Sequence, residues 1–147
     1  MLLNFARQWK TNVRKKPKLR TYDKIKENYE VENYVVLNLE RHQRSVLAQL
    51  RAGILPLQVE LGRFRNIKLE DRLCTFCNAN AIEDELHLLF HCDLYTEERK
   101  VFTGQLPNDW NELQDSLKLK TLFQNYERKL SKYVCKLLDK RQYNMFK

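Results

Sequence analysis

The amino-acid sequence predicts a mainly α-helical fold, made of several short helices and one longer C-terminal helix. The 147 residues include only three glycines and three prolines, whereas leucine, lysine, glutamate and glutamine, which favour helices, are frequent. Apolar side chains recur at helical spacing in several segments, most regularly near the C-terminus. A hydrophobic fraction of 43% is enough to form a core, so we expect one small ordered domain.

The predicted helices follow one another along the first half of the chain. We expect helical segments at residues 2–13, 22–30, 29–39, 40–52 and 55–61. The stretch 29–39 is the densest apolar run, and its β-branched residues suit a strand as well, but its helical flanks favour a buried helix. Gly53 should end the helix before it as a C′ glycine, and Gly62 should close the short segment that follows.

In the second half we expect short helices near residues 94–102 and 117–123, a turn capped by Asp109 at residues 109–113, and a last helix at 125–142. That last helix is amphipathic. Its apolar stripe consists of Tyr126, Leu130, Tyr133, Val134, Leu137 and Leu138. Its opposite stripe consists of Lys129, Lys132, Lys136 and Lys140, which form either a solvated face or a phosphate-binding patch. Arg41, Arg44 and Arg51 make a basic face on the 40–52 helix, which we expect to be solvated.

Three of the four cysteines and two of the three histidines lie within residues 73–92. Cys74 and Cys77 form a C-x2-C pair, and His87 and Cys92 complete the pattern C-x2-C-x9-H-x4-C. Zn²⁺ takes four nitrogen or sulfur ligands in a tetrahedron, and two short-range pairs separated by a spacer supply them. The sequence therefore predicts a CCHC zinc knuckle with a structural, rather than catalytic, metal.

The predicted helix that carries His87 does not decide which residue is the fourth ligand. Residues 82–92 suit a short helix, but residues five apart do not share one face of a straight helix, so it should loosen or end at Cys92. His91, four residues after His87, is the alternative fourth ligand. A metal-free cluster of reduced thiols and a redox-active C-x2-C pair are the remaining interpretations.

The net charge of +8 is concentrated at the two ends of the chain. Each of the segments 1–26, 27–117 and 118–147 contains nine Lys/Arg residues. The first contains one acidic residue, the second sixteen and the third two. The acidic run 83–85 suits the first turn of a helix, but we expect a DNA groove to repel it. The chain ends, rather than the knuckle, are therefore the predicted contacts to nucleic acid.

We expect a basic N-terminal arm at residues 1–20 and a helical domain at 21–147, which contains the knuckle at 73–92. The predicted phosphate contacts are Arg14, Lys15, Lys16, Lys18, Arg20, Lys129, Lys132, Lys136 and Lys140. Trp9 and Tyr22 flank the first of these runs and can stack on unpaired bases. The run also suits a nuclear-import signal, and a solvated linker is the alternative.

The first apolar run is too short for a signal peptide, and no stretch approaches the length of a membrane span. Together with the cysteine pattern, this predicts an intracellular protein, with the nucleus as one candidate compartment. We expect no membrane partner and no small-molecule substrate.

Several runs together carry a family resemblance. These are RSVLAQLRAGILPL at 44–57, RLCTFC at 72–77, EDELHLLFHC at 83–92, and Tyr95 with Arg99. They resemble the C-terminal cysteine-histidine region of non-LTR retrotransposon reverse transcriptases, which also occurs in short transposon-derived proteins. The resemblance covers residues 18–103. It implies Cys74, Cys77, His87 and Cys92 as zinc ligands, and a role in holding template nucleic acid for an enzyme encoded elsewhere in the same chain.

No catalytic motif of such elements is complete in this sequence. A Tyr/Phe-x-Asp-Asp polymerase motif does not occur, and Pro107-Asn108-Asp109 departs from the Pro-Asp pattern of the associated nucleases. Glu98-Arg99-Lys100 has acid-x-Lys spacing but precedes Asp109. We therefore expect a zinc-stabilised, non-catalytic nucleic-acid-binding module. The alternative is a protein-interaction module, or an inert retroelement fragment, in which zinc only supports folding.

Overall fold

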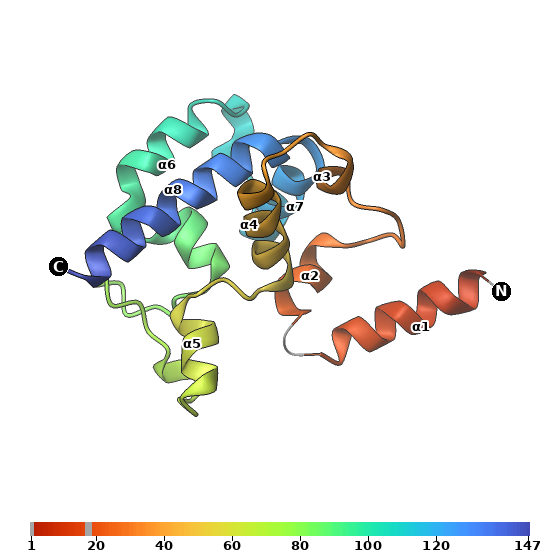
Figure 1. Ribbon diagram of the computed structural model, residues 1–147, viewed down its shortest axis with the longest axis horizontal. Helices are drawn as coiled ribbons and strands as arrows, with labels where there is room; N and C mark the ends of the chain where they lie inside the picture. Colours follow the sequence, from red (N-terminus) through yellow and green to blue (C-terminus); the bar gives the residue numbers. More distant parts are fainter. Residues whose placement is uncertain (1, 17–18) are drawn as a thin grey trace.

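The protein is a multi-helix domain in a computed structural model that describes residues 2–16 and 19–147 (Figure 1). Its α-helices are α1 (Leu2–Arg14), α2 (Arg20–Ile25), α3 (Asn33–Val36), α4 (Arg41–Ala52), α5 (Gln58–Phe64), α6 (Thr96–Thr103), α7 (Asp115–Asn125) and α8 (Glu127–Met145). Shorter turns of 3-10 or π type are η2 (Leu69–Asp71), η3 (His87–His91), η4 (Asp93–Tyr95) and η5 (Asn108–Glu112). Within these residues the β pairing consists of one isolated bridge between Leu73 and Ile82. The predicted mainly helical fold is confirmed.

Helix α8 runs through the middle of the domain, and α4, α6 and α7 pack against it (Figure 1). Leu130, Val134 and Leu137 of its predicted apolar stripe are fully buried. Burial of each such side chain contributes about 1.5–3 kcal/mol. The amphipathic C-terminal helix is therefore confirmed, although it begins two residues later and ends three residues later than predicted.

The two glycines predicted to end helices have different roles. Gly53 ends α4 in the left-handed conformation, with φ of 71°, as a C′ glycine should. Gly62 lies inside α5 rather than closing it. A Cβ at this position would lie 2.6 Å from Cγ of Arg72, so the absence of a side chain lets Arg72 pack against the helix. The prediction for Gly62 was wrong because this close approach comes from a residue ten positions away.

The predicted buried helix at 29–39 is reduced to the single turn α3. Val31 and Val36 are about three-quarters exposed, at 74% and 77%, so the prediction of a buried helix was wrong. Helices α4, α7 and α8 already supply the neighbouring core, and Leu39 is the residue of this segment that becomes buried in it. Tyr34 and Leu37 pack against this core partly buried, and the other apolar residues lie on the surface connection between α2 and α4.

The predicted solvated arginine face on α4 is wrong for Arg51, which is buried. Its guanidinium forms an ion pair with Glu32 and lies 4.5 Å from the ring centroid of Tyr22. Burial of an arginine is tolerated when such partners replace water. Arg51 therefore connects α4 to α2 and to the segment before α3.

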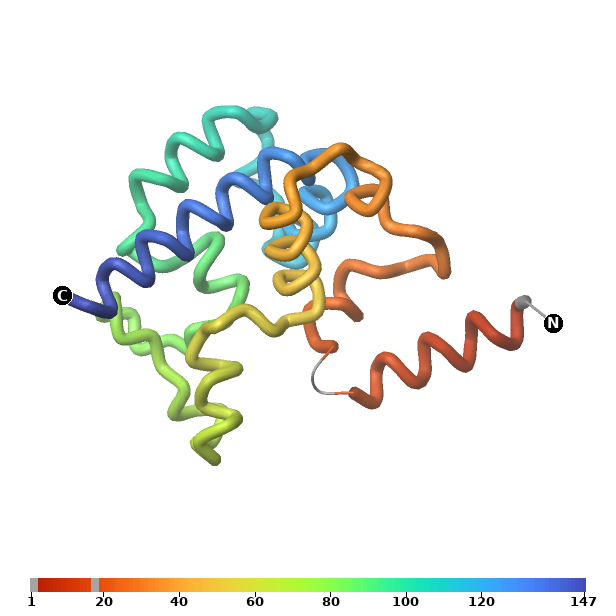
Figure 2. The backbone as a smooth tube through the Cα atoms, viewed as in Figure 1, coloured from red at the N-terminus to blue at the C-terminus, as the bar shows by residue number. Residues whose placement is uncertain are grey.

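Helix α1 packs on α2, and the two termini of the chain lie at opposite ends of the long axis (Figure 2). The predicted arm at 1–20 is therefore largely this helix, and its predicted boundary coincides with the first residue of α2. None of the helices in the described part of the chain combines the length and hydropathy that crossing a bilayer requires.

Candidate metal centre

Cys74 and Cys77 lie on a tight loop that closes between residues 73 and 82. The N–H of Cys74 donates to the carbonyl of Ala81 (2.8 Å), next to the Leu73–Ile82 bridge. Asn80 adopts a φ of 51°, in the left-handed region that asparagine tolerates better than most residues. This closure holds the two thiols on one short turn.

His87 and Cys92 come from the helical segment that follows the loop. The Asp84 carboxylate accepts a hydrogen bond from the N–H of His87 (2.8 Å), which caps the start of this segment. The segment then continues as the π-helix η3, whose last hydrogen bond joins the N–H of Cys92 to the carbonyl of His87 (2.8 Å). Because a π-turn closes over five residues rather than four, it brings His87 and Cys92 to the same side. The expected loosening of the helix is confirmed.

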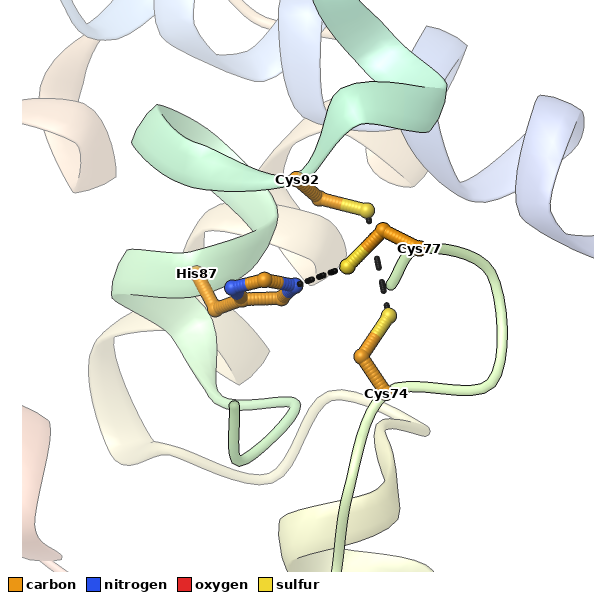
Figure 3. Close-up of side chains that lie close together, drawn as sticks. All are labelled: Cys74, Cys77, His87 and Cys92. Carbon is orange, nitrogen blue, oxygen red and sulfur yellow. Dashed lines mark hydrogen bonds between the residues drawn. The ribbon is translucent and has the colours of Figure 1, made fainter. Parts of the chain in front are cut away.

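The ligand atoms of Cys74, Cys77, His87 and Cys92 all lie within 4.8 Å of one another. Figure 3 shows the four side chains pointing toward a common centre, two from the loop and two from the helical segment. The sulfurs of Cys74 and Cys92 are 3.8 Å apart, and Sγ of Cys77 is 3.4 Å from Nε2 of His87. These four residues form a cluster that can hold a metal ion.

The cluster is largely buried, and burial sets its protonation. Burial raises the pKa of the Cys74 thiol and raises the pKa of the Cys92 thiol to about 12. Burial also lowers the pKa of His87, which favours the neutral imidazole that a metal needs. Without a cation, the raised pKa values keep the Cys74 and Cys92 thiols protonated at neutral pH. A bound cation would stabilise the thiolates and release their protons.

The alternative fourth ligand, His91, lies outside this cluster. Its side chain is 55% exposed, and its Nε2 contacts the carboxylate of Asp115 at the start of α7. The helical face that His87 and His91 would share in an α-helix is lost when the segment widens into η3. The structure therefore brings Cys92, rather than His91, together with the other three residues.

We expect His91→Ala to leave metal binding by the four-residue cluster unchanged and to lower the free energy of unfolding by no more than about 1 kcal/mol, because it removes a surface pair. Metal content of the purified variant and its thermal unfolding curve test this. Loss of metal from His91→Ala would return His91 to the ligand set.

Two side chains outside the cluster support the widened turn. Arg99 of α6 donates to the carbonyls of Cys92 (2.6 Å) and Leu89 (3.3 Å). The Tyr133 hydroxyl of α8 donates to the same Leu89 carbonyl (2.8 Å). Carbonyl groups in a widened turn need such partners when buried. The residue spacing of this segment gave no sign of either contact.

The acidic run at 83–85 has a role that the sequence did not reveal. Glu83 and Arg141 form a buried, two-bonded ion pair (2.7 and 2.8 Å), and Glu83 also accepts the N–H of Gln58 (2.8 Å). Glu85 is buried and pairs with Arg20 (2.7 Å). These two carboxylates are paired in the interior and are not the exposed acidic first turn that the expected repulsion of nucleic acid assumed. One sequence feature could have indicated this pair: Arg141 follows Leu137 by four residues, so a charged residue lies on the apolar stripe of the last helix.

The predicted phosphate contacts differ in their availability. Lys15 and Lys16 are exposed, Arg14 lies 3.5 Å from Asp23, and Arg20 is engaged by Glu85. Lys18 lies outside the described residues.

On α8, Lys140 pairs with Glu98 (2.9 Å), whereas Lys129, Lys132 and Lys136 line a cavity of about 400 Å³ between α6 and α8. The two basic end segments of the chain meet where α2 contacts α7, and Lys120 of α7 pairs with Glu27 shortly after α2. The chain termini themselves lie at opposite ends of the molecule (Figure 2).

No family model, no curated protein and no solved structure matches this chain. Its function is therefore inferred from the chemistry of the cluster and from the charge of the surface.

Proposed function

We propose that Cys74, Cys77, His87 and Cys92 bind one structural Zn²⁺. Zinc–sulfur and zinc–nitrogen bonds of about 2.3 and 2.0 Å in a tetrahedron place two sulfurs about 3.8 Å apart and a sulfur and a nitrogen about 3.5 Å apart. The Cys74–Cys92 and Cys77–His87 separations of 3.8 and 3.4 Å match these values, and all four ligand atoms lie within 4.8 Å of one another. A redox C-x2-C pair would not need His87 and Cys92 beside it. Four protein ligands leave no position for a reactive water, which supports a structural role.

We further propose that the protein is a non-catalytic nucleic-acid-binding module of retroelement origin. The retroelement origin rests on the resemblance carried by residues 44–57, 72–77 and 83–92. The observation that carries nucleic-acid binding is the charge of α1 and the residues after it. Residues 1–22 contain no Asp or Glu, and Arg7, Lys10, Lys15 and Lys16 are exposed. Such a surface attracts phosphates of any sequence. The same basic run is a candidate nuclear-import signal, so we extend the proposal to the nucleus.

The residues nearest to a nuclease pattern are engaged structurally, which supports a non-catalytic role. Glu98 pairs with Lys140, and Arg99 binds the carbonyls of the widened turn. Asp109 lies on η5, on the surface.

A protein-interaction module remains the second candidate, and one observation favours it. A cavity of about 450 Å³ near the end of α8 is lined mainly by apolar side chains, among them Pro56, Leu61, Leu138, Met145 and Phe146. Anchor side chains of a protein partner fill well-packed apolar pockets at interfaces.

Replacing Lys15 and Lys16 with glutamine should weaken binding to nucleic acid and reduce its salt dependence. Each lost phosphate contact should flatten the slope of log affinity against log salt by about 0.7–0.9. Fluorescence anisotropy with labelled oligonucleotides at several salt concentrations measures both quantities.

The matched control is Arg65→Gln with Lys68→Gln, which removes the same charge from exposed positions near the end of α5. An unchanged affinity and slope in the Lys15/Lys16 variant would exclude these residues from the binding surface. Absence of binding by the intact protein at about 50 mM salt would contradict the nucleic-acid proposal and favour the protein-interaction module.

A further inference from the structure

Four aromatic rings gather where α1 meets α2 and the segment after it. The ring centroid of Trp9 lies 5.9 Å from that of Tyr22 and 5.6 Å from that of Tyr29, and Phe5 lies 5.5 Å from Tyr29, all edge to face. A cavity of about 510 Å³ opens between them. Phe5 and Tyr29 are each 57% exposed, so their rings remain available to a ligand. We call this cavity the aromatic pocket.

The polar residues that line the aromatic pocket are uncharged amides and one cation. Gln8 and Asn12 lie four residues apart on α1, so they share one face of the helix. Their side chains carry both a donor and an acceptor, which suits the edge of a nucleobase. Lys16 lies at the end of the same row and can contact a phosphate.

The charge around the aromatic pocket favours an anionic ligand. Residues 1–22 lack acidic side chains, and Asp23, the next acid along the chain, lies 3.5 Å from Arg14. Of the acids in the segment that carries Tyr29, Glu27 pairs with Lys120, and Glu32 pairs with Lys26 and Arg51. Glu30 is exposed. An apolar protein segment would use the rings but would gain little from the lysines and arginines of α1. A single-stranded nucleic acid uses both, since its bases stack on aromatic rings and its phosphates bind cations.

We propose that the aromatic pocket binds an unpaired nucleobase, so that the protein prefers single strands to duplex. This inference rests on the proposed nucleic-acid function and adds a ligand class to it. In a duplex the bases are stacked and paired, so a surface pocket of aromatic rings has no free base to receive. Lys16 and its neighbours hold the backbone, while Trp9 and Tyr29 receive the base.

The test compares two single-stranded 20-nucleotide DNAs of equal length and charge, one with all its bases and one with abasic sites at its central positions. We expect the full-length protein to bind the base-bearing strand at least about fivefold more tightly, the lower end of the stacking contribution of one base. Trp9→Ala and, separately, Tyr29→Ala should abolish this preference while the salt slope stays unchanged. Leu3→Ala, an exposed apolar residue of α1 outside the pocket, is the matched control and should keep it.

A second readout does not depend on removing an aromatic ring of the pocket. The chain has two tryptophans, and Trp110 is buried. In Trp110→Phe, Trp9 is therefore the only source of tryptophan emission. The base-bearing strand should quench this emission, and the abasic strand should not.

Affinity for the abasic strand tests phosphate binding by itself. The difference in affinity between the two strands tests whether the aromatic pocket binds a base. Equal affinity for both strands, with no quenching, would overturn the pocket while leaving the phosphate-binding surface in place. Failure of both strands to bind would overturn both proposals, and would point to a protein partner for the aromatic surface.

Discussion

If the cluster binds zinc as proposed, Cys92→Ser should lose the metal, and the centre of the domain should unfold. Structural zinc sites in small domains contribute about 10–16 kcal/mol of apparent binding free energy, which is comparable to the whole stability of a typical domain, about 5–15 kcal/mol. Cys92 is 1% exposed, so its replacement also leaves a buried hydroxyl beside the other ligands. Metal analysis and circular dichroism of the purified variant measure both effects. A chelator should have the same effect on the wild-type protein.

Cys135→Ser is the matched control, because Cys135 is half-buried on α8 and outside the cluster. It should keep one metal per chain and most of its helical signal. Limited proteolysis shows where the protein unfolds, because chelation should expose residues 70–100 to cleavage. Retention of metal by Cys92→Ser, or a helical signal and protease resistance unaffected by chelator, would contradict a structural zinc at this site.

Arg141→Met should destabilise the domain by about 3–5 kcal/mol, the usual cost of removing one partner from a buried ion pair. The side chains of Arg141 and Glu83 are only 3% and 2% exposed, so the remaining carboxylate would lie unpaired in the interior. The pair also joins α8 to the strand-like segment that follows the cysteine loop. Chemical denaturation of the zinc-bound protein measures the change.

The double variant Glu83→Gln with Arg141→Met should be less destabilised than the sum of the two single variants, because it removes both charges. Lys100→Ala, which removes one partner of an exposed pair with Glu97, should change stability by no more than about 1 kcal/mol. A loss of less than about 1 kcal/mol in Arg141→Met would mean that the pair does not stabilise the fold.

The local features of this protein could be predicted from its sequence. The apolar stripe of α8, the C′ role of Gly53 and the spacing of the cysteines depend on residues a few positions apart. The loosening before Cys92 was also predictable, because five residues between two convergent side chains do not fit an α-helix. In each case the backbone geometry links the residues directly.

Features that depend on distant partners could not be predicted. Glu83 and Glu85 were interpreted through the helix macrodipole, whereas their partners lie 58 residues later, at Arg141, and 65 residues earlier, at Arg20. Arg51 and the apolar stretch at 29–39 follow the same pattern, because burial is decided by which helices fill the core. A charged residue on an apolar stripe, as at Arg141, is the clearest sequence sign of such a pair.

X-ray absorption at the zinc edge on the purified wild-type protein is the most direct measurement of the central claim. The cluster of Cys74, Cys77, His87 and Cys92 predicts one zinc per chain with three sulfur neighbours at about 2.3 Å and one nitrogen at about 2.0–2.1 Å. A shell of two sulfurs and two nitrogens would instead require His91 as a ligand. That shell, an oxygen neighbour from a bound water, or a protein without zinc would contradict the four-residue site.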